Sequence, residues 1–243
     1  MFSPAFQAAF LILSLPFTSS IPLSPREDII SGTKLRILPL GDSITFGFQP
    51  SHPDGTNGYR YQLGQRLSGS DFSFVGTMRS GNMTDNYNEG HPGYTISQIQ
   101  KVMAGGLDLK PNVVLLHAGT NDLNRDANAD ESYSGAPARL GNLIDSILNV
   151  RPDALVLVAQ IINAKKAETE TRIKTFNKAV PGVVKKRVVQ GHKVMIVDQS
   201  VVKASELVDG LHPTDGGYAH MGDVWFENLK AAADQDLITP LVD

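Results

Sequence analysis

The sequence predicts an α/β domain of three layers, an α/β/α sandwich with helices on both faces of a central parallel sheet of about five strands. Short runs rich in Val, Ile and Leu alternate along the chain with longer segments whose apolar residues recur at a helical period. Runs that are apolar on both faces are typical of parallel strands covered by helices. The alternation continues to the end of the chain, so we expect a single domain over residues 33–243.

Five segments have the length and composition of buried strands. Most of their residues are leucine or β-branched, which favours a place inside a parallel sheet. The predicted strands are residues 35–39, 72–75, 113–118, 154–161 and 194–197.

Helices are predicted between and after these strands, because apolar residues there recur every three or four positions. A helix over residues 169–187 is expected to kink or split at Pro181-Gly182, since proline has no N–H for the helical hydrogen bond. The predicted apolar faces are Tyr59, Leu63 and Leu67; Ile96, Ile99 and Met103; Leu140, Leu143, Ile144, Ile147 and Leu148; Ile173, Phe176, Val180 and Val184; and Tyr218, Met221, Trp225 and Leu229.

Composition excludes several classes of function. The chain has no cysteine, which rules out disulfides, thiolate metal sites, iron–sulfur clusters and a cysteine nucleophile. Its 22 Lys and Arg residues against 25 Asp and Glu residues give a net charge of −3, with no long basic run. Binding to nucleic acid needs a concentrated basic face, so we do not expect a nucleic-acid partner.

The first 20 residues are predicted to be a signal peptide, followed by a lead over residues 21–32. No ionisable side chain occurs before Arg26, and Ala8 to Phe17 is almost entirely apolar. As a helix this run would span about 15 Å, half of a hydrocarbon layer of ~30 Å, so we expect secretion rather than a membrane anchor. The alternative is an apolar tail that is disordered or docked. Asn82 begins an N-x-Thr sequon, which a secretory route would make available for glycosylation.

Three long loops rich in Gly, Asn and Asp follow predicted strands: Gly41 to Gly58, Gly76 to Gly93 and Gly119 to Ala136. Ligands of parallel α/β sheets bind at the rim where the carboxyl ends of the strands meet. Long loops inside a compact domain are usually functional. We therefore look for the chemistry in these loops.

Ser43 follows the first strand directly and is a candidate nucleophile. A serine hydroxyl needs a base and a carboxylate to orient that base. Asp209 and His212 lie three positions apart in the loop before the last helix and fit these roles. Alternatives are open for each: Ser43 as a turn or cap residue, and Asp209 as the start of an Asx turn beside a surface histidine.

Acyl transfer also requires hydrogen-bond donors for the developing oxyanion. Asn121 follows the third strand and offers a side-chain amide at the same rim. Gly93 offers a backbone N–H just before a helix start marked by Thr95 and Gln98, a capping-box pattern. We prefer Gly93 to Gly90 for this reason. The alternative interpretations are that Asn121 only caps a helix and that Gly90 and Gly93 only form turns.

Taken in chain order, Ser43, Gly93, Asn121 and His212 resemble the four residues that name the SGNH, or GDSL-type, hydrolase superfamily. The surrounding motifs resemble carbohydrate esterase family three, over about residues 35 to 230. These motifs are GDSITFG at 41–47, EGHPGYT at 89–95, LLHAGTND at 115–122 and DGLHP at 209–213.

The resemblance implies a flavodoxin-like fold and a secreted, extracellular acetyl esterase, acting on acetylated polysaccharide or oligosaccharide such as xylan. It implies that Ser43 attacks, His212 acts as base and then acid, and Asp209 orients His212. The N–H groups of Ser43 and Gly93 and the Asn121 amide would form the oxyanion hole. Alternatives are a short-chain lipase, lysophospholipase or thioesterase on the same scaffold, and a non-catalytic carbohydrate-binding protein.

We expect no cofactor, no metal, no membrane partner and a monomer. A run of acidic and amide residues from Asp122 to Asp130 is similar to a calcium loop. However, Ala127 stands where the turn needs glycine and Tyr133 where the loop needs glutamate, so a bound calcium is not our prediction.

Overall fold

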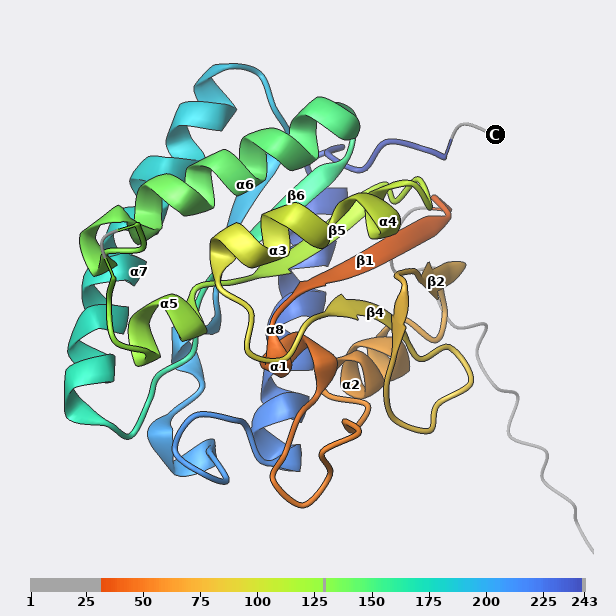
Figure 1. Cartoon of the computed structure of the whole chain (residues 1–243). Helices are drawn as coiled ribbons and strands as arrows, with labels where there is room; N and C mark the ends of the chain where they lie inside the picture. The colour runs from red at the N-terminus through yellow and green to blue at the C-terminus, as the bar shows by residue number, and fades with distance from the viewer. Residues whose placement is uncertain (1–31, 129, 242–243) are drawn as a thin grey trace, which may run out of the picture.

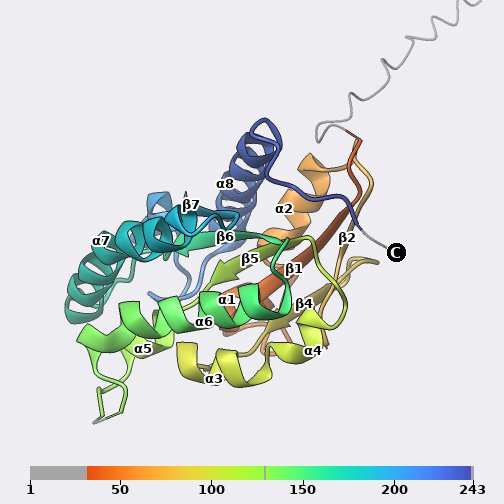
Figure 2. The same cartoon turned by 90° about the horizontal axis from the view of Figure 1, so that it is seen from above.

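A computed structural model describes residues 32–128 and 130–241 (Figure 1). The predicted signal peptide and almost all of the predicted lead lie outside the described residues. The described part has the predicted three layers, with helices on both faces of one sheet (Figure 2).

The sheet contains all five predicted strands and two further short ones, in the order β3-β4-β1-β5-β6-β7, with β2 paired to β1. Pairing is parallel except between β3 and β4. The strands are β1 (Leu35–Gly41), β2 (Phe72–Phe74), β3 (Met78–Arg79), β4 (Tyr87–Gly90), β5 (Val113–His117), β6 (Leu155–Gln160) and β7 (Val194–Asp198). The estimate of about five strands therefore missed β3 and β4, whose sequences are short and polar.

One edge of β1 is shared by two strands. β2 pairs with its first half, Leu35 to Ile37, and β4 pairs with its last two residues, Leu40 and Gly41. The opposite edge of β1 pairs with β5. As a result, the chain just before Gly93 runs beside the end of the strand that leads to Ser43.

The helices enclose two apolar cores, one on each face of the sheet. In Figure 2, α2 and α8 cover one face, while α3, α4, α6 and α7 cover the other. Trp225 is fully buried in the core beneath α8, as predicted. The helices are α1 (Ser43–Phe46), α2 (Tyr59–Arg66), α3 (Ile96–Val102), α4 (Ala104–Leu107), α5 (Thr120–Asn124), α6 (Ala136–Val150), α7 (Ala167–Val189) and α8 (Asp215–Ala233), with 3-10 turns at Tyr133–Gly135, Gln199–Val201 and Ala204–Glu206.

The predicted split at Pro181 is wrong, because α7 runs through it as one helix. Proline cannot donate to the carbonyl of Asn177, four residues earlier. That carbonyl instead accepts a hydrogen bond from Gln160 Nε2 at 2.8 Å. The side chain at the end of β6 thus replaces the missing helical donor.

Within residues 32–128 and 130–241, no helix combines the length and the apolar character needed to cross a membrane. The loops that follow β1, β4, β5 and β7 gather at the lower end of the sheet in Figure 1, where the predicted site residues lie.

Candidate active site

Ser43 begins α1, directly after β1. Asp42 is the N-cap of this helix, and its Oδ1 accepts the N–H of Ile44 at 2.9 Å. Gly41 has to be glycine, since a Cβ there would lie 2.2 Å from the carbonyl oxygen of His117 on the neighbouring strand. The close approach of β1 and β5 and the tight turn at Asp42 together place the serine hydroxyl at the rim. Ser43 is only 6% exposed.

Asp42 lies fully buried beneath this turn. Burial raises the pKa of its carboxyl group to about 6, against the opposing effect of the Ile44 N–H bond. Its role is to hold the backbone of α1, as its hydrogen bond to Ile44 shows.

Ser43, His212 and Asp209 form a chain of hydrogen bonds. Ser43 Oγ lies 2.9 Å from His212 Nε2, across 169 positions of sequence. His212 Nδ1 lies 2.7 Å from Asp209 Oδ2. The side chain of His212 is 12% exposed, and the ring of Phe48 packs on it with centroids 4.7 Å apart.

Asp209 also forms the Asx turn that was its alternative interpretation. Its Oδ1 accepts the backbone N–H groups of Leu211 at 2.9 Å and His212 at 2.8 Å. Partial burial opposes ionisation, but these hydrogen bonds and the His212 ring together lower the pKa of Asp209 below its usual value. An ionised carboxylate can only accept, so the proton of neutral His212 lies on Nδ1 and Nε2 is left to accept from Ser43.

Gly93 presents a backbone N–H for which the described part of the chain offers no acceptor. Gly93 has a φ of +82°, a conformation that favours glycine. The N–H of Gly90, by contrast, donates to Asn88 Oδ1 at 2.9 Å and is therefore occupied. Thr95 is the N-cap of α3 as predicted, with its N–H donating to Gln98 Oε1 at 2.9 Å.

Asn121 lies in the first turn of α5, almost buried at 8% exposure. Its Nδ2 donates to the carbonyl of Tyr94 at 3.0 Å, which leaves its second N–H for another acceptor. The structure therefore brings the segments of all the sequence-predicted site residues to the same rim of the sheet.

Sequence reasoning did not identify the partners that support these segments. Glu89 is almost completely buried, and its carboxylate lies 2.7 Å from His91 Nε2 and accepts from both the N–H and the hydroxyl of Thr77. Arg125 donates to the carbonyl of Gly93. Arg139 binds Asp122, next to Asn121. Glu89, His91 and Asp122 lie within the quoted motifs, whereas their partners Thr77 and Arg139, and Arg125, lie outside them.

Among the described residues, no group of three or more His, Asp or Glu side chains is placed to hold a metal ion. Asp122, the first residue of the run that is similar to a calcium loop, is engaged by Arg139 and by the Ile96 N–H. Asn128 Oδ1 accepts the N–H groups of Asp130 and Glu131.

Hydrolases of the SGNH class are defined by a serine, a glycine, an asparagine and a histidine in this chain order. This chain carries them at the carboxyl rim of an α/β/α sheet. Its sequence also matches the model of the GDSL-like lipase/acylhydrolase family over residues 40–220.

Solved structures narrow the class. A family 3 carbohydrate esterase from Clostridium thermocellum is 33% identical, with a TM-score of 0.67, and the match covers 82% of this chain and 99% of that one. A carbohydrate esterase family 3 structure from Talaromyces cellulolyticus shares the fold, with 24% identity, a TM-score of 0.68 and coverage of 83% and 99%. The chain belongs to the GDSL-like lipase/acylhydrolase family and, within it, to carbohydrate esterase family 3.

A multidomain esterase of Ruminococcus flavefaciens is 29% identical over 254 residues. The match covers 90% of this chain but 31% of that relative, so the chain spans about a third of the relative's length.

Proposed function

We propose that this chain is a secreted serine esterase that removes acetyl groups from acetylated carbohydrate, with xylan as the expected polymer. The observation that carries the proposal is the hydrogen-bonded sequence Asp209, His212 and Ser43, with separations of 2.7 and 2.9 Å. This arrangement can generate a serine nucleophile near neutral pH.

In the first half of the reaction, Ser43 Oγ attacks the acetyl carbonyl carbon while His212 Nε2 accepts the hydroxyl proton. The imidazolium that results is stabilised by the ionised Asp209. His212 then donates the proton to the departing sugar oxygen, leaving an acetyl group on Ser43. In the second half, His212 takes a proton from water, whose oxygen attacks the acetyl carbon. The bond between Ser43 Oγ and the acetyl carbon then breaks, His212 returns the proton to Ser43 Oγ, and acetate leaves.

The negative charge of each tetrahedral intermediate would be stabilised by three donors. Ser43 N–H lies at the start of α1, the Gly93 N–H has no acceptor in the described part of the chain, and the second N–H of Asn121 is not used by Tyr94. Donors that are already in place before the reaction stabilise the transition state without a cost of reorganisation.

A carbohydrate substrate is supported by a cavity of about 460 Å³ whose lining combines apolar and polar groups. Its lining includes Asp215 and Tyr218 at the start of α8, shortly after His212. Gln49 joins the two regions, donating to the carbonyl of Pro213 at 3.1 Å and to Asp215 Oδ1 at 3.0 Å. We propose that the sugar chain enters this cavity.

The other walls of the cavity suit a sugar. Tyr61 is 53% exposed and offers an aromatic face, and Asn57, Gln62 and Asn82 supply amide groups. An aromatic face combined with amide hydrogen-bonding groups can bind both the apolar and the hydroxylated sides of a pyranose ring.

The test is acetate release by the full chain from acetylated xylan, acetylated pectin and small sugar acetates, alongside hydrolysis of medium-chain esters. The expected result is release from the acetylated sugars, abolished in Ser43→Ala. Faster hydrolysis of medium-chain esters would favour the lipase alternative. Failure of an organophosphonate to label Ser43 in folded protein would favour a non-catalytic binding protein.

A further inference from the structure

Three hydrogen bonds join the two segments that carry the proposed oxyanion donors. One segment, Gly93 to Ile96, leads into α3. The other, Asn121 to Arg125, consists of α5 residues and the C-cap of that helix. The bonds run from Arg125 to the carbonyl of Gly93, from Asn121 Nδ2 to the carbonyl of Tyr94 at 3.0 Å, and from the Ile96 N–H to Asp122 Oδ2 at 2.9 Å. The relative position of Gly93 and Asn121 thus depends on contacts between these segments.

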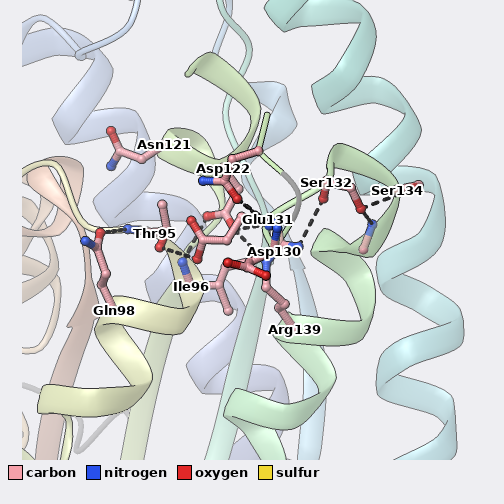
Figure 3. A network of polar contacts seen from close by, with 12 residues as sticks. Thr95, Ile96, Gln98, Asn121, Asp122, Asp130, Glu131, Ser132, Ser134 and Arg139 are labelled. Atoms are coloured by element: carbon pink, nitrogen blue, oxygen red, sulfur yellow. Dashed lines mark hydrogen bonds and ion pairs between the residues drawn. The ribbon is translucent and has the colours of Figure 1, made fainter. Parts of the chain in front are cut away.

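The last of these bonds is fixed in turn by a buried ion pair. Asp122 Oδ1 accepts from Arg139 Nε at 3.1 Å and Nη2 at 2.9 Å, so a single oxygen receives both arms of the guanidinium (Figure 3). The Asp122 side chain is 0% exposed and that of Arg139 is 13% exposed. The remaining guanidinium nitrogen of Arg139, Nη1, donates to the carbonyl of Ser132 at 3.0 Å.

A second contact closes the same region from the other side. Thr95 Oγ1 donates to Glu131 Oε1 at 2.9 Å, from the loop between α5 and α6 (Figure 3). The start of α3 is therefore held both to α5, through Asp122, and to the loop that precedes α6.

An ion pair is an unexpected choice for simple packing at this place. Removing both charges from water is costly, and an apolar pair of similar size would usually hold two helices together at least as well. What the ion pair adds is direction, because two N–H groups of Arg139 hold Oδ1 of the carboxylate while the Ile96 N–H binds Oδ2. Here that carboxylate adjoins Asn121 in sequence and bonds to Ile96, three residues after Gly93.

We propose that Asp122 and Arg139 are positioning residues of the oxyanion hole, which set the Gly93 N–H and the Asn121 amide at the separation that a tetrahedral oxyanion requires. This inference rests on the proposed function. As positioning residues, Asp122 and Arg139 do not contact the substrate; both act through α5 and the start of α3. Arg125, which holds the Gly93 carbonyl from the exposed end of α5, contributes to the same geometry.

The principal test compares Arg139→Ala and Arg139→Lys with the wild type, using p-nitrophenyl acetate so that sugar binding is not involved. We expect kcat to fall about 10- to 100-fold in Arg139→Ala with KM within twofold, because only the transition state carries the oxyanion. Arg139→Lys should restore part of the loss, since lysine keeps the charge but lacks the planar fork. Titration of Ser43 with an organophosphonate counts the folded sites, so that kcat refers to them alone.

Arg187→Ala is the matched control. Arg187 donates from Nε and Nη2 to the two oxygens of Asp145, between α7 and α6; its side chain is 11% exposed, and that of Asp145 is 48% exposed. Its loss should lower the melting temperature without changing kcat per titrated site. A general effect of removing a largely buried, paired arginine side chain would lower kcat per titrated site in both variants.

A double-mutant cycle tests whether Arg139 acts through the oxyanion hole. If it does, adding Arg139→Ala to Asn121→Ala should cost less than threefold, because the hole has already lost one of its donors. A boronic acid inhibitor, whose tetrahedral adduct carries a negative charge, should bind Arg139→Ala more weakly by a factor close to the loss in kcat.

Arg125→Ala keeps the proposal testable if Arg139→Ala fails to fold, because Arg125 is exposed. Arg125→Ala should lower kcat about three- to tenfold with an unchanged melting temperature. Arg79 is another exposed arginine that donates to a loop side chain, and Arg79→Ala should leave kcat unchanged. The proposal is overturned if Arg139→Ala or Arg125→Ala retains wild-type kcat per titrated site, or if the effects of Arg139→Ala and Asn121→Ala multiply fully. A wild-type chain without esterase activity would instead remove the proposed function, and this inference with it.

Discussion

Asp209 holds His212 through both the ring and the backbone. Its Oδ2 lies 2.7 Å from the ring Nδ1 and its Oδ1 accepts the backbone N–H of the same residue at 2.8 Å. A short turn thereby fixes the imidazole in the tautomer that leaves Nε2 facing Ser43. The turn and the proposed catalytic arrangement are one structure, so the two interpretations of this motif do not exclude one another.

Replacing Asp209 with asparagine should lower kcat about 10²- to 10⁴-fold, because the neutral amide no longer stabilises the imidazolium and can favour the wrong tautomer. The backbone turn should survive, since the asparagine oxygen can still accept both N–H groups. The measurement is kcat per titrated Ser43. Asp198→Asn, which alters a similar turn onto the Ser200 N–H, is the control and should leave kcat unchanged. Wild-type activity in Asp209→Asn would contradict the proposed role.

The pH dependence of kcat/KM should reveal one ionisation on the acid side. The pKa of Asp209 lies below its usual value, so this carboxylate stays ionised while His212 becomes protonated on acidification. Activity should therefore fall as a single proton is taken up, and the protein should remain folded, as checked by circular dichroism. A fall that required two protons would show that a second carboxyl group, Asp209 or the buried Asp42, takes up a proton in the same range, and Asp42→Asn would distinguish the two.

Asn121→Ala should lower kcat about 10²- to 10³-fold with little change in KM, corresponding to about 2.7–4 kcal/mol of transition-state stabilisation. It removes the amide next to Tyr94 while leaving the backbone of α5 in place. Asn228→Ala is a matched control, because that amide also donates to a backbone carbonyl, in the distant part of α8. Equal losses in the two variants would show that the effect comes from folding rather than from the oxyanion.

The sequence was sufficient for features determined by neighbouring residues. Buried strands have apolar runs, and the segments at Ser43, Asn121 and Asp209 to His212 each follow a strand, so the topology of a parallel sheet predicts that they meet. Gly93 could be preferred to Gly90 from the capping pattern at Thr95. The occupied N–H of Gly90 agrees with that choice.

Features that depend on distant partners could not be predicted in the same way. β4 has the sequence Tyr-Asn-Glu-Gly, which has no strand pattern, and its Asn88 and Glu89 are buried with polar partners supplied by the fold. Arg139 meets Asp122 from 17 positions away on another helix. α7 continues through Pro181, and Gln160 of β6 supplies the hydrogen bond that the proline cannot donate. In each case a polar group is satisfied by a partner that no local pattern identifies.

The buried carboxyl of Asp42 should make stability depend on pH. Its pKa is raised from 3.8 to about 6 in the folded protein, mainly by burial. Because the folded state holds the proton more tightly, the contribution of Asp42 to stability is fully present below about pH 4 and is lost as the pH rises through about 6. The shift of about two pKa units corresponds to about 3 kcal/mol.

Asp42→Asn removes this ionisation and keeps an acceptor for the Ile44 N–H. The free energy of unfolding of the variant relative to the wild type should therefore increase by about 2 kcal/mol between pH 4 and pH 7, since the unfolded carboxyl is already partly ionised at pH 4. The measurement is urea unfolding at both values. A difference that does not change with pH would show that Asp42 ionises normally in the folded protein.

The proposed sugar cavity leads to a prediction that separates substrate binding from chemistry. Tyr61→Ala should raise KM for an acetylated xylo-oligosaccharide about 5- to 10-fold, because a stacked aromatic contact contributes about 1–1.5 kcal/mol. It should leave kcat and KM for p-nitrophenyl acetate unchanged, since neither Ser43 nor any proposed oxyanion donor lines this cavity. Tyr87→Ala, at an exposed tyrosine on β4, is the control for a general surface effect. If KM for the oligosaccharide is the same in the wild type and in Tyr61→Ala, the sugar chain binds elsewhere. If kcat/KM falls equally for both substrates, Tyr61 supports the catalytic loop instead.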